Sequence, residues 1–168
     1  MSETIICEPL TRHAFAPFGD VLEASGEPDK LINQGLCGRY HDLAGLDFTG
    51  NGARAGVSLF KSEKRQLPYQ LEMVERHPLG SQAFLPMTQE PFLVIVCPDE
   101  NGVPGRPRAF ITSPGQGINF HRGTWHGVLT PLSDPGLFAV VDRIGEGENL
   151  EEFWFEAPYQ IAERQASI

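Results

Sequence analysis

The sequence predicts an all-β fold, an antiparallel barrel or jelly roll with a short helix near the N-terminus. Short runs rich in β-branched and aromatic residues follow one another from residue 57 onward. Glycine and proline together supply about 19% of the 168 residues, against roughly 12% in typical proteins, as the turns between many strands require. No repeat, low-complexity segment or linker divides this series, and the length suits one domain spanning residues 1–168.

The N-terminal part is predicted to form one short helix and one strand. Thr11 can cap a short helix that runs through Phe15 and Phe18 and is ended by Gly19, and we expect this helix to lie as a lid on the core. The run 20–23 is then predicted as a strand. Residues 26–54 are rich in turn residues and are predicted as loop or short strand near a site.

Later strands are predicted where apolar runs lie between turn signals such as Asn101-Gly102 and Ser113-Pro114-Gly115. These strands cover residues 57–60, 71–77, 82–86, 92–97, 108–111, 117–121, 137–141 and 153–155. The last of them, Phe153-Trp154-Phe155, could cover a sheet edge or form part of a dimer contact.

Composition excludes several classes of function. The chain carries 22 acidic and 13 basic side chains, and this net charge of -9 repels a phosphate backbone, which argues against nucleic-acid binding. Nothing at the N-terminus resembles a signal peptide, and no stretch is long enough to span a membrane. Three scattered cysteines indicate neither a disulfide framework nor a zinc knuckle, so we expect a cytoplasmic protein.

The segment 75–87 is the most informative part of the chain. Period-two alternation places Glu75 and His77 on the strand face that also carries Leu71 and Met73. If that face is buried, an ionisable pair lies where charge is costly unless a metal ion or a bound substrate compensates it. This arrangement indicates a functional site more than a packing role.

A second segment, 115–126, complements the first one. A glycine-containing turn is followed by a predicted strand that ends at His121, and Trp125 and His126 come shortly after it. Two imidazoles, one carboxylate and one amide oxygen would make a divalent-metal site if the strands adjoin. The expected ligands are Glu75, His77, Gln82 and His121. Zinc, nickel, iron and manganese are not distinguished by this pattern.

Other side chains are candidates for acid–base chemistry and for substrate binding. His126, or the pair His41 and Asp42, could serve as acid or base, because imidazole titrates near neutral pH. An acidic chain needs local arginines to bind a small anion, and the guanidinium fork suits a carboxylate. The candidate anchors are Arg39, Arg65 and Arg143.

Taken together, these segments resemble the ureidoglycolate lyase family. The resemblance follows chain order from about Phe15 to Arg143. Its segments are Arg39-Tyr40-His41-Asp42-Leu43, residues 75–87, Arg108-Ala109-Phe110-Ile111, Gln116-Gly117 with Asn119, and His121-Arg122 with Trp125-His126. The resemblance implies a cupin-like double-stranded β-helix barrel and a cytoplasmic homodimer that splits ureidoglycolate into glyoxylate and urea in purine and allantoin breakdown.

The resemblance also implies a divalent ion, with nickel, zinc and manganese as candidates. Where many cupins carry His-x-His followed by Glu, this chain has Glu75, His77 and Gln82, and His121 takes the place of the histidine in the second cupin motif. We hypothesise that the metal assists removal of the proton from the substrate hydroxyl. His126 or His41 would then protonate the departing nitrogen.

Three alternative functions stay open from the sequence. Two histidines and a carboxylate also describe a non-haem iron oxygenase. A hydrolase acting on the same substrate would release ammonia and carbon dioxide instead of urea. A non-catalytic cupin that binds a small acid would gain thermal stability from its ligand without consuming it.

Overall fold

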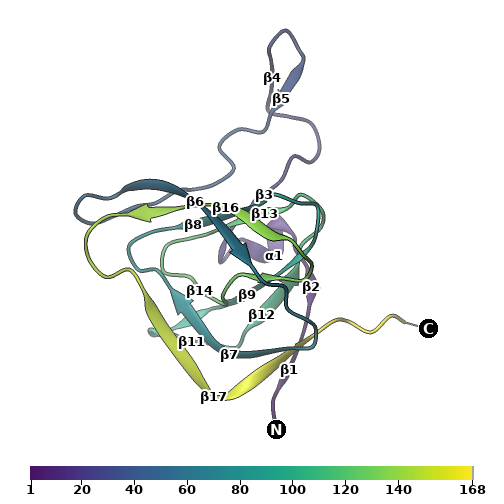
Figure 1. The fold of residues 1–168 in the computed structure, drawn as a ribbon, viewed down its shortest axis with the longest axis vertical. Coiled ribbons are helices and arrows are strands. Elements are labelled where there is room, and N and C mark those ends of the chain that lie inside the picture. Colours follow the sequence, from purple (N-terminus) through teal and green to yellow (C-terminus); the bar gives the residue numbers. More distant parts are fainter. Residues whose placement is uncertain (168) are drawn as a thin grey trace.

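Two facing β-sheets form a nearly closed barrel in the computed structural model, which describes residues 1–167 (Figure 1). Almost all regular structure is β, and this confirms the predicted all-β, cupin-like fold. The only helix among these residues, α1 (Arg12–Phe15), is capped by Thr11, whose hydroxyl accepts a hydrogen bond from the Ala14 amide at 3.2 Å. Phe15 is fully buried, so the helix covers the core as expected, but it ends at Phe15 and does not continue through Phe18 as predicted.

The larger sheet, called sheet A below, runs in the order β1-β17-β7-β14-β9-β12-β2, with β15 also paired to β9. Its pairs are antiparallel except for β1 with β17 and β2 with β12. The strands are β1 (Thr4–Ile6), β2 (Glu8–Pro9), β7 (Tyr69–Arg76), β9 (Phe92–Cys97), β12 (Arg108–Ile111), β14 (Trp125–His126), β15 (Thr130–Pro131) and β17 (Glu151–Ala162).

The smaller sheet, sheet B, runs in the order β3-β13-β8-β16-β6, all antiparallel. Two separate hairpins complete the fold, and one of them turns at Asn101-Gly102 as predicted, with φ positive at both residues. The remaining strands are β3 (Gly19–Leu22), β4 (Lys30–Ile32), β5 (Cys37–Arg39), β6 (Arg54–Ser62), β8 (Gln82–Pro86), β10 (Asp99–Glu100), β11 (Val103–Pro104), β13 (Gly117–Phe120) and β16 (Gly136–Ile144).

Strand β9 is buried on both faces and separates two apolar clusters. Phe92, Val94 and Val96 pack into the barrel core between the two sheets, together with Phe120 and other residues of sheet B. The alternate residues of β9 pack into a second cluster with β1, β7 and β17. Because side chains alternate along a strand, β9 fixes which neighbouring side chains face the barrel core.

The predicted alternation along residues 71–77 is interrupted. Leu71 and Val74 both enter the second cluster although they lie three residues apart. Opposite this stretch, the register of β17 shifts between Trp154 and Tyr159. An irregularity of this kind redirects side chains, so the prediction that Glu75 shares a face with Leu71 is wrong.

The β4–β5 hairpin, called the arm below, stands away from the barrel at the top of Figure 1. Its Leu31 and Leu36 are largely exposed. This hairpin lies within the segment 26–54 that was predicted as loop or short strand. No helix among the described residues has the length and apolar character needed to cross a membrane.

Candidate active site

Neighbouring strands of sheet A bring a carboxylate and an imidazole face to face. In the ladder between β7 and β14, His126 lies directly opposite Glu75. Trp125, its neighbour on the two-residue strand β14, packs into the second cluster, so alternation directs His126 to the barrel core. There its ring stacks on Phe120, with the ring centroids 4.2 Å apart and the planes 4° from parallel.

His77 follows the end of β7 and joins this pair. Its Nε2 lies 3.9 Å from Oε1 of Glu75, and its ring centroid lies 5.1 Å from that of His126. One ligand atom from each of the three side chains lies within 4.8 Å of the others. We call Glu75, His77 and His126 the inner triad.

Backbone carbonyl groups set the tautomer of both imidazoles. Nδ1 of His77 lies 2.8 Å from the Asn149 carbonyl oxygen, and Nδ1 of His126 lies 2.9 Å from that of Gly127. A carbonyl oxygen can only accept a hydrogen bond, so each Nδ1 carries a proton, and in the neutral form of either ring Nε2 presents a lone pair. Both Nε2 atoms are buried, and neither has a hydrogen-bond partner within residues 1–167.

Burial changes the proton affinity of two members of the inner triad. Burial, assisted by the charge of His77 and opposed by the Gly127 hydrogen bond, lowers the pKa of His126 to about 3. Burial also raises the pKa of Glu75; Glu152 adds to this shift and His77 opposes it. His126 is therefore neutral near pH 7. Lone pairs from two imidazoles and a carboxylate converge here, an arrangement that favours a bound cation.

Gln82 of sheet B adds a fourth hydrogen-bond acceptor that faces the barrel core. It lies opposite Phe120 in the β8–β13 ladder, and Phe120 stacks on His126. Its Nε2 donates to Oδ2 of Asp142 at 3.1 Å, which turns Oε1 the other way. That oxygen is buried and has no partner in the described part of the chain. Gln82 is thus suited to serve as a neutral oxygen ligand.

The structure does not bring His121 into the inner triad. Ile118 and Phe120 of β13 point into the barrel core, so His121, one residue further on, lies on the outer side. There its Nε2 lies 3.2 Å from Oδ1 of Asp20, and its side chain is 44% exposed. Although burial opposes the shift, hydrogen bonds from Gly45, Asn119 and His121 lower the pKa of Asp20.

The pair His121 and Asp20 lines a cleft of about 380 Å³ on the outside of the barrel. His41 and Asp42, the other predicted acid–base pair, line the same cleft. We call it the outer cleft. The predicted site residues are therefore divided between two places, the inner triad with Gln82 and the outer cleft.

Among the described residues, none of the three predicted substrate anchors forms a hydrogen bond or ion pair with the inner triad. Arg143 is buried and donates to the Thr49 and Glu146 carbonyl oxygens, each at 2.6 Å. Arg39 lies exposed on the arm. Arg65 is exposed after β6, where its amide donates to the Pro131 carbonyl oxygen.

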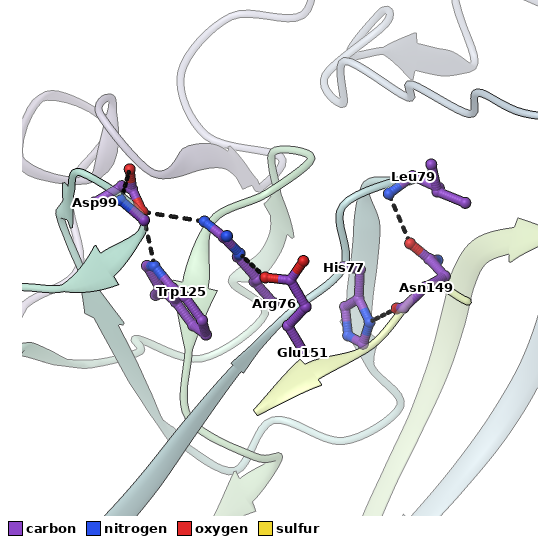
Figure 2. A network of polar contacts seen from close by, with 8 residues as sticks. Arg76, His77, Leu79, Asp99, Trp125, Asn149 and Glu151 are labelled. Atoms are coloured by element: carbon purple, nitrogen blue, oxygen red, sulfur yellow. Dashed lines mark hydrogen bonds and ion pairs between the residues drawn. The ribbon is translucent and has the colours of Figure 1, made fainter. Parts of the chain in front are cut away.

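Sequence reasoning missed a clamp on the opposite face of β7 and β14. Arg76 lies between Asp99 and Glu151 (Figure 2) and donates hydrogen bonds to their carboxylates at 3.0 and 2.6 Å, and the Trp125 indole N–H donates to Asp99. The Arg76 guanidinium also lies 4.3 Å from the Trp125 ring centroid. Arg76 and Trp125 alternate with Glu75 and His126 along the two strands. Their contacts therefore link β7 and β14 on the face opposite the inner triad.

Comparison with known proteins gives one consistent family. The family model described as "Ureidoglycolate lyase" matches residues 2–162. The chain is similar to the ureidoglycolate lyase of Chelativorans sp. (strain BNC1), with 60% identity over 157 residues, 94% of this chain and 95% of that protein. It is also 60% identical over 159 residues to that of Rhodobacter capsulatus, covering 95% and 98% of the two chains. The protein of this name from Mesorhizobium japonicum is 55% identical over 157 residues, 94% and 96% of the two chains.

Proposed function

The chain belongs to the ureidoglycolate lyase family, and from this premise we propose that it splits ureidoglycolate into glyoxylate and urea at the inner triad. One observation carries the location: two buried imidazole nitrogens, neither with a hydrogen-bond partner among the described residues, lie there beside a carboxylate. We propose that residues 1–168 form one catalytic domain that does this work, in keeping with the family match over 2–162.

The inner triad fits a divalent cation. We assign Glu75, His77 and His126 as ligands, with Gln82 as a neutral fourth ligand. In this assignment His126 replaces His121, which was expected from the sequence. An ion bound there would act as a Lewis acid toward the oxygens of the substrate. Imidazole and carboxylate donors suit nickel, zinc and manganese alike. The buried, partnerless Nε2 atoms of both histidines support this assignment.

The reaction moves one proton and breaks one bond. Ureidoglycolate is a carbinolamine, so loss of its hydroxyl proton forms the aldehyde carbonyl while the carbon–nitrogen bond breaks and the nitrogen of urea takes up a proton. Glu75 has two carboxylate oxygens, so one would bind the ion while the other accepts the proton from the substrate oxygen and returns it to nitrogen. No water is consumed.

His126 acts as a ligand in this proposal and not as an acid. With a pKa of about 3, its Nε2 carries no proton to donate near neutral pH. The outer cleft, with His41, Asp42 and His121, is the second place where proton transfer could occur. We favour the inner triad as the place of the reaction, because its hydrogen-bond acceptors are buried, whereas His121 in the outer cleft is exposed.

Product analysis tests the reaction. We expect the purified protein to accelerate glyoxylate release from ureidoglycolate with one urea per glyoxylate and no ammonia, measured against a control without enzyme because the substrate decays unaided. Removal of divalent ions with a chelator should abolish the acceleration, and adding nickel, zinc or manganese should restore it. Ammonia in place of urea would indicate a hydrolase. Oxygen consumption would indicate an oxygenase.

We also propose a cytoplasmic homodimer. All three cysteines are free thiols, which suits a reducing compartment. Strand β6 is one of the two edge strands of sheet B, and its Val57 and Leu59 are 75% and 65% exposed. They lie opposite Val141 and Ala139 of β16, while the other face of the sheet forms the barrel core. An apolar outer face on an antiparallel sheet supports burial against a second copy.

The arm supports the same proposal. An isolated two-stranded hairpin has little stability in water, and the arm exposes Leu31 and Leu36 beyond the barrel. In a symmetric dimer each copy can cover the apolar surface of the other.

A further inference from the structure

The loop between β16 and β17 reaches the inner triad through one residue, Asn149. Figure 2 shows both contacts. The main-chain carbonyl oxygen of Asn149 accepts a hydrogen bond from Nδ1 of His77 at 2.8 Å. Its side-chain Oδ1 accepts from the Leu79 amide at 2.7 Å. Both donors belong to the segment that leaves β7.

Pro78 explains why the Asn149 side chain, and not a regular ladder hydrogen bond, contacts this segment. The β7–β17 ladder pairs Arg76 with Glu151, so the two chains continue side by side toward Pro78 and Asn149. Proline has no amide proton and cannot donate to a ladder. Asn149 instead takes the donors on either side of Pro78, one from the imidazole ring and one from the main chain.

The rest of the loop is held independently of Asn149. Arg143 donates to the Glu146 carbonyl oxygen, and Asn51 donates to the Glu146 carboxylate at 2.7 Å. The Arg76–Glu151 ion pair fixes the start of β17. Removing the Asn149 side chain should therefore disturb the carbonyl position locally without releasing the whole loop.

We propose that Asn149 is a positioning residue that sets the tautomer and orientation of His77. Its carbonyl keeps the proton on Nδ1, so that the Nε2 lone pair faces Glu75 and His126, and the bond from Leu79 holds that carbonyl in place. The inference rests on the proposed function in so far as it concerns metal binding. Hydrogen bonds from ligating imidazoles to carbonyl groups orient the ligand, and losing such a partner typically weakens metal affinity about 10-fold to 100-fold.

Two variants separate this role from a general effect on the loop. Asn149→Ala removes the acceptor for the Leu79 amide, whereas Asn149→Asp retains an oxygen in the same position. Leu150→Ala, which truncates an exposed neighbour in the same loop, is the matched control. Each protein would be prepared metal-free as the full chain with ¹⁵N-labelled histidine, and its melting temperature would be recorded.

The first measurement is the tautomer of His77 from its ring ¹⁵N shifts in the metal-free protein. We expect protonated Nδ1 in the wild type, in Asn149→Asp and in Leu150→Ala, and a mixture of tautomers in Asn149→Ala. The second is Zn²⁺ affinity by competition with a chelating dye. We expect Asn149→Ala to bind Zn²⁺ about 10-fold to 100-fold more weakly than Leu150→Ala, with partial recovery in Asn149→Asp.

The outcomes distinguish this inference from the proposed function. Protonated Nε2 on His77 in the wild type, or unchanged tautomer and Zn²⁺ affinity in Asn149→Ala, would overturn the role of Asn149. A wild-type protein that binds no Zn²⁺, Ni²⁺ or Mn²⁺ would instead overturn the metal site. In that event the tautomer measurement would still decide whether Asn149 positions His77.

Discussion

Replacing His126 with alanine is expected to lower kcat/KM for ureidoglycolate by at least about 100-fold and to weaken divalent-metal affinity to the same extent. Loss of an outer hydrogen-bond partner already costs up to about 100-fold in metal affinity, and this change removes a ligand itself. Metal-reconstituted activity and Zn²⁺ titration would measure both effects. The melting temperature would confirm that the variant, which loses a fully buried ring, is folded at the assay temperature.

His121→Ala is the matched control for this experiment. The sequence-based hypothesis makes His121 a ligand and expects turnover to be lost. Its position beside Asp20 on the outer side of the barrel leads us to expect that metal affinity is retained within a few-fold. Loss of metal binding in His121→Ala together with retention in His126→Ala would contradict our assignment of the ligands.

Replacing Leu59 with glutamate is expected to weaken the proposed homodimer by more than about 100-fold. A charged group buried at an apolar interface without a partner costs several kcal/mol, and about 1.4 kcal/mol corresponds to a tenfold change in affinity. Light scattering coupled to size-exclusion chromatography, over a dilution series, would give the mass of the wild type and the variant.

Val103→Glu serves as the matched change for Leu59→Glu. Val103 is also a half-exposed apolar residue, but it lies in the β10–β11 hairpin and not on the outer face of sheet B. We expect this variant to stay dimeric. A monomeric wild type, or a Leu59→Glu variant with unchanged mass, would remove the support for this interface.

Local patterns predicted most strands, because period-two alternation and turn residues act over short distances. The predicted bounds of 82–86, 92–97 and 108–111 agree with β8, β9 and β12. Short strands were missed because two or three residues carry no periodicity. Strand β14 is the important case, since only its pairing with β7 and β9 reveals that His126 belongs to a strand at all.

The candidate site was partly predictable. Glu75, His77 and Gln82 were identified from sequence as polar groups near one another, whereas the choice between His121 and His126 depended on which face each residue takes. A signal for that choice existed: Ile118 and Phe120 are apolar, and alternation then directs His121 away from the core. The role of Asn149 left no such signal, because a main-chain carbonyl contacts a ring 72 positions away in sequence.

If Glu75, His77 and His126 together bind the divalent ion that the reaction requires, the ion will be visible between them. Anomalous diffraction from crystals of the metal-free protein soaked in Ni²⁺ or Zn²⁺ would locate it. We expect one strong peak at about 2.0–2.2 Å from Nε2 of both histidines and from a Glu75 carboxylate oxygen. A peak in the outer cleft between His121 and Asp20, or no peak at the inner triad in a protein that is active with the added metal, would contradict this assignment.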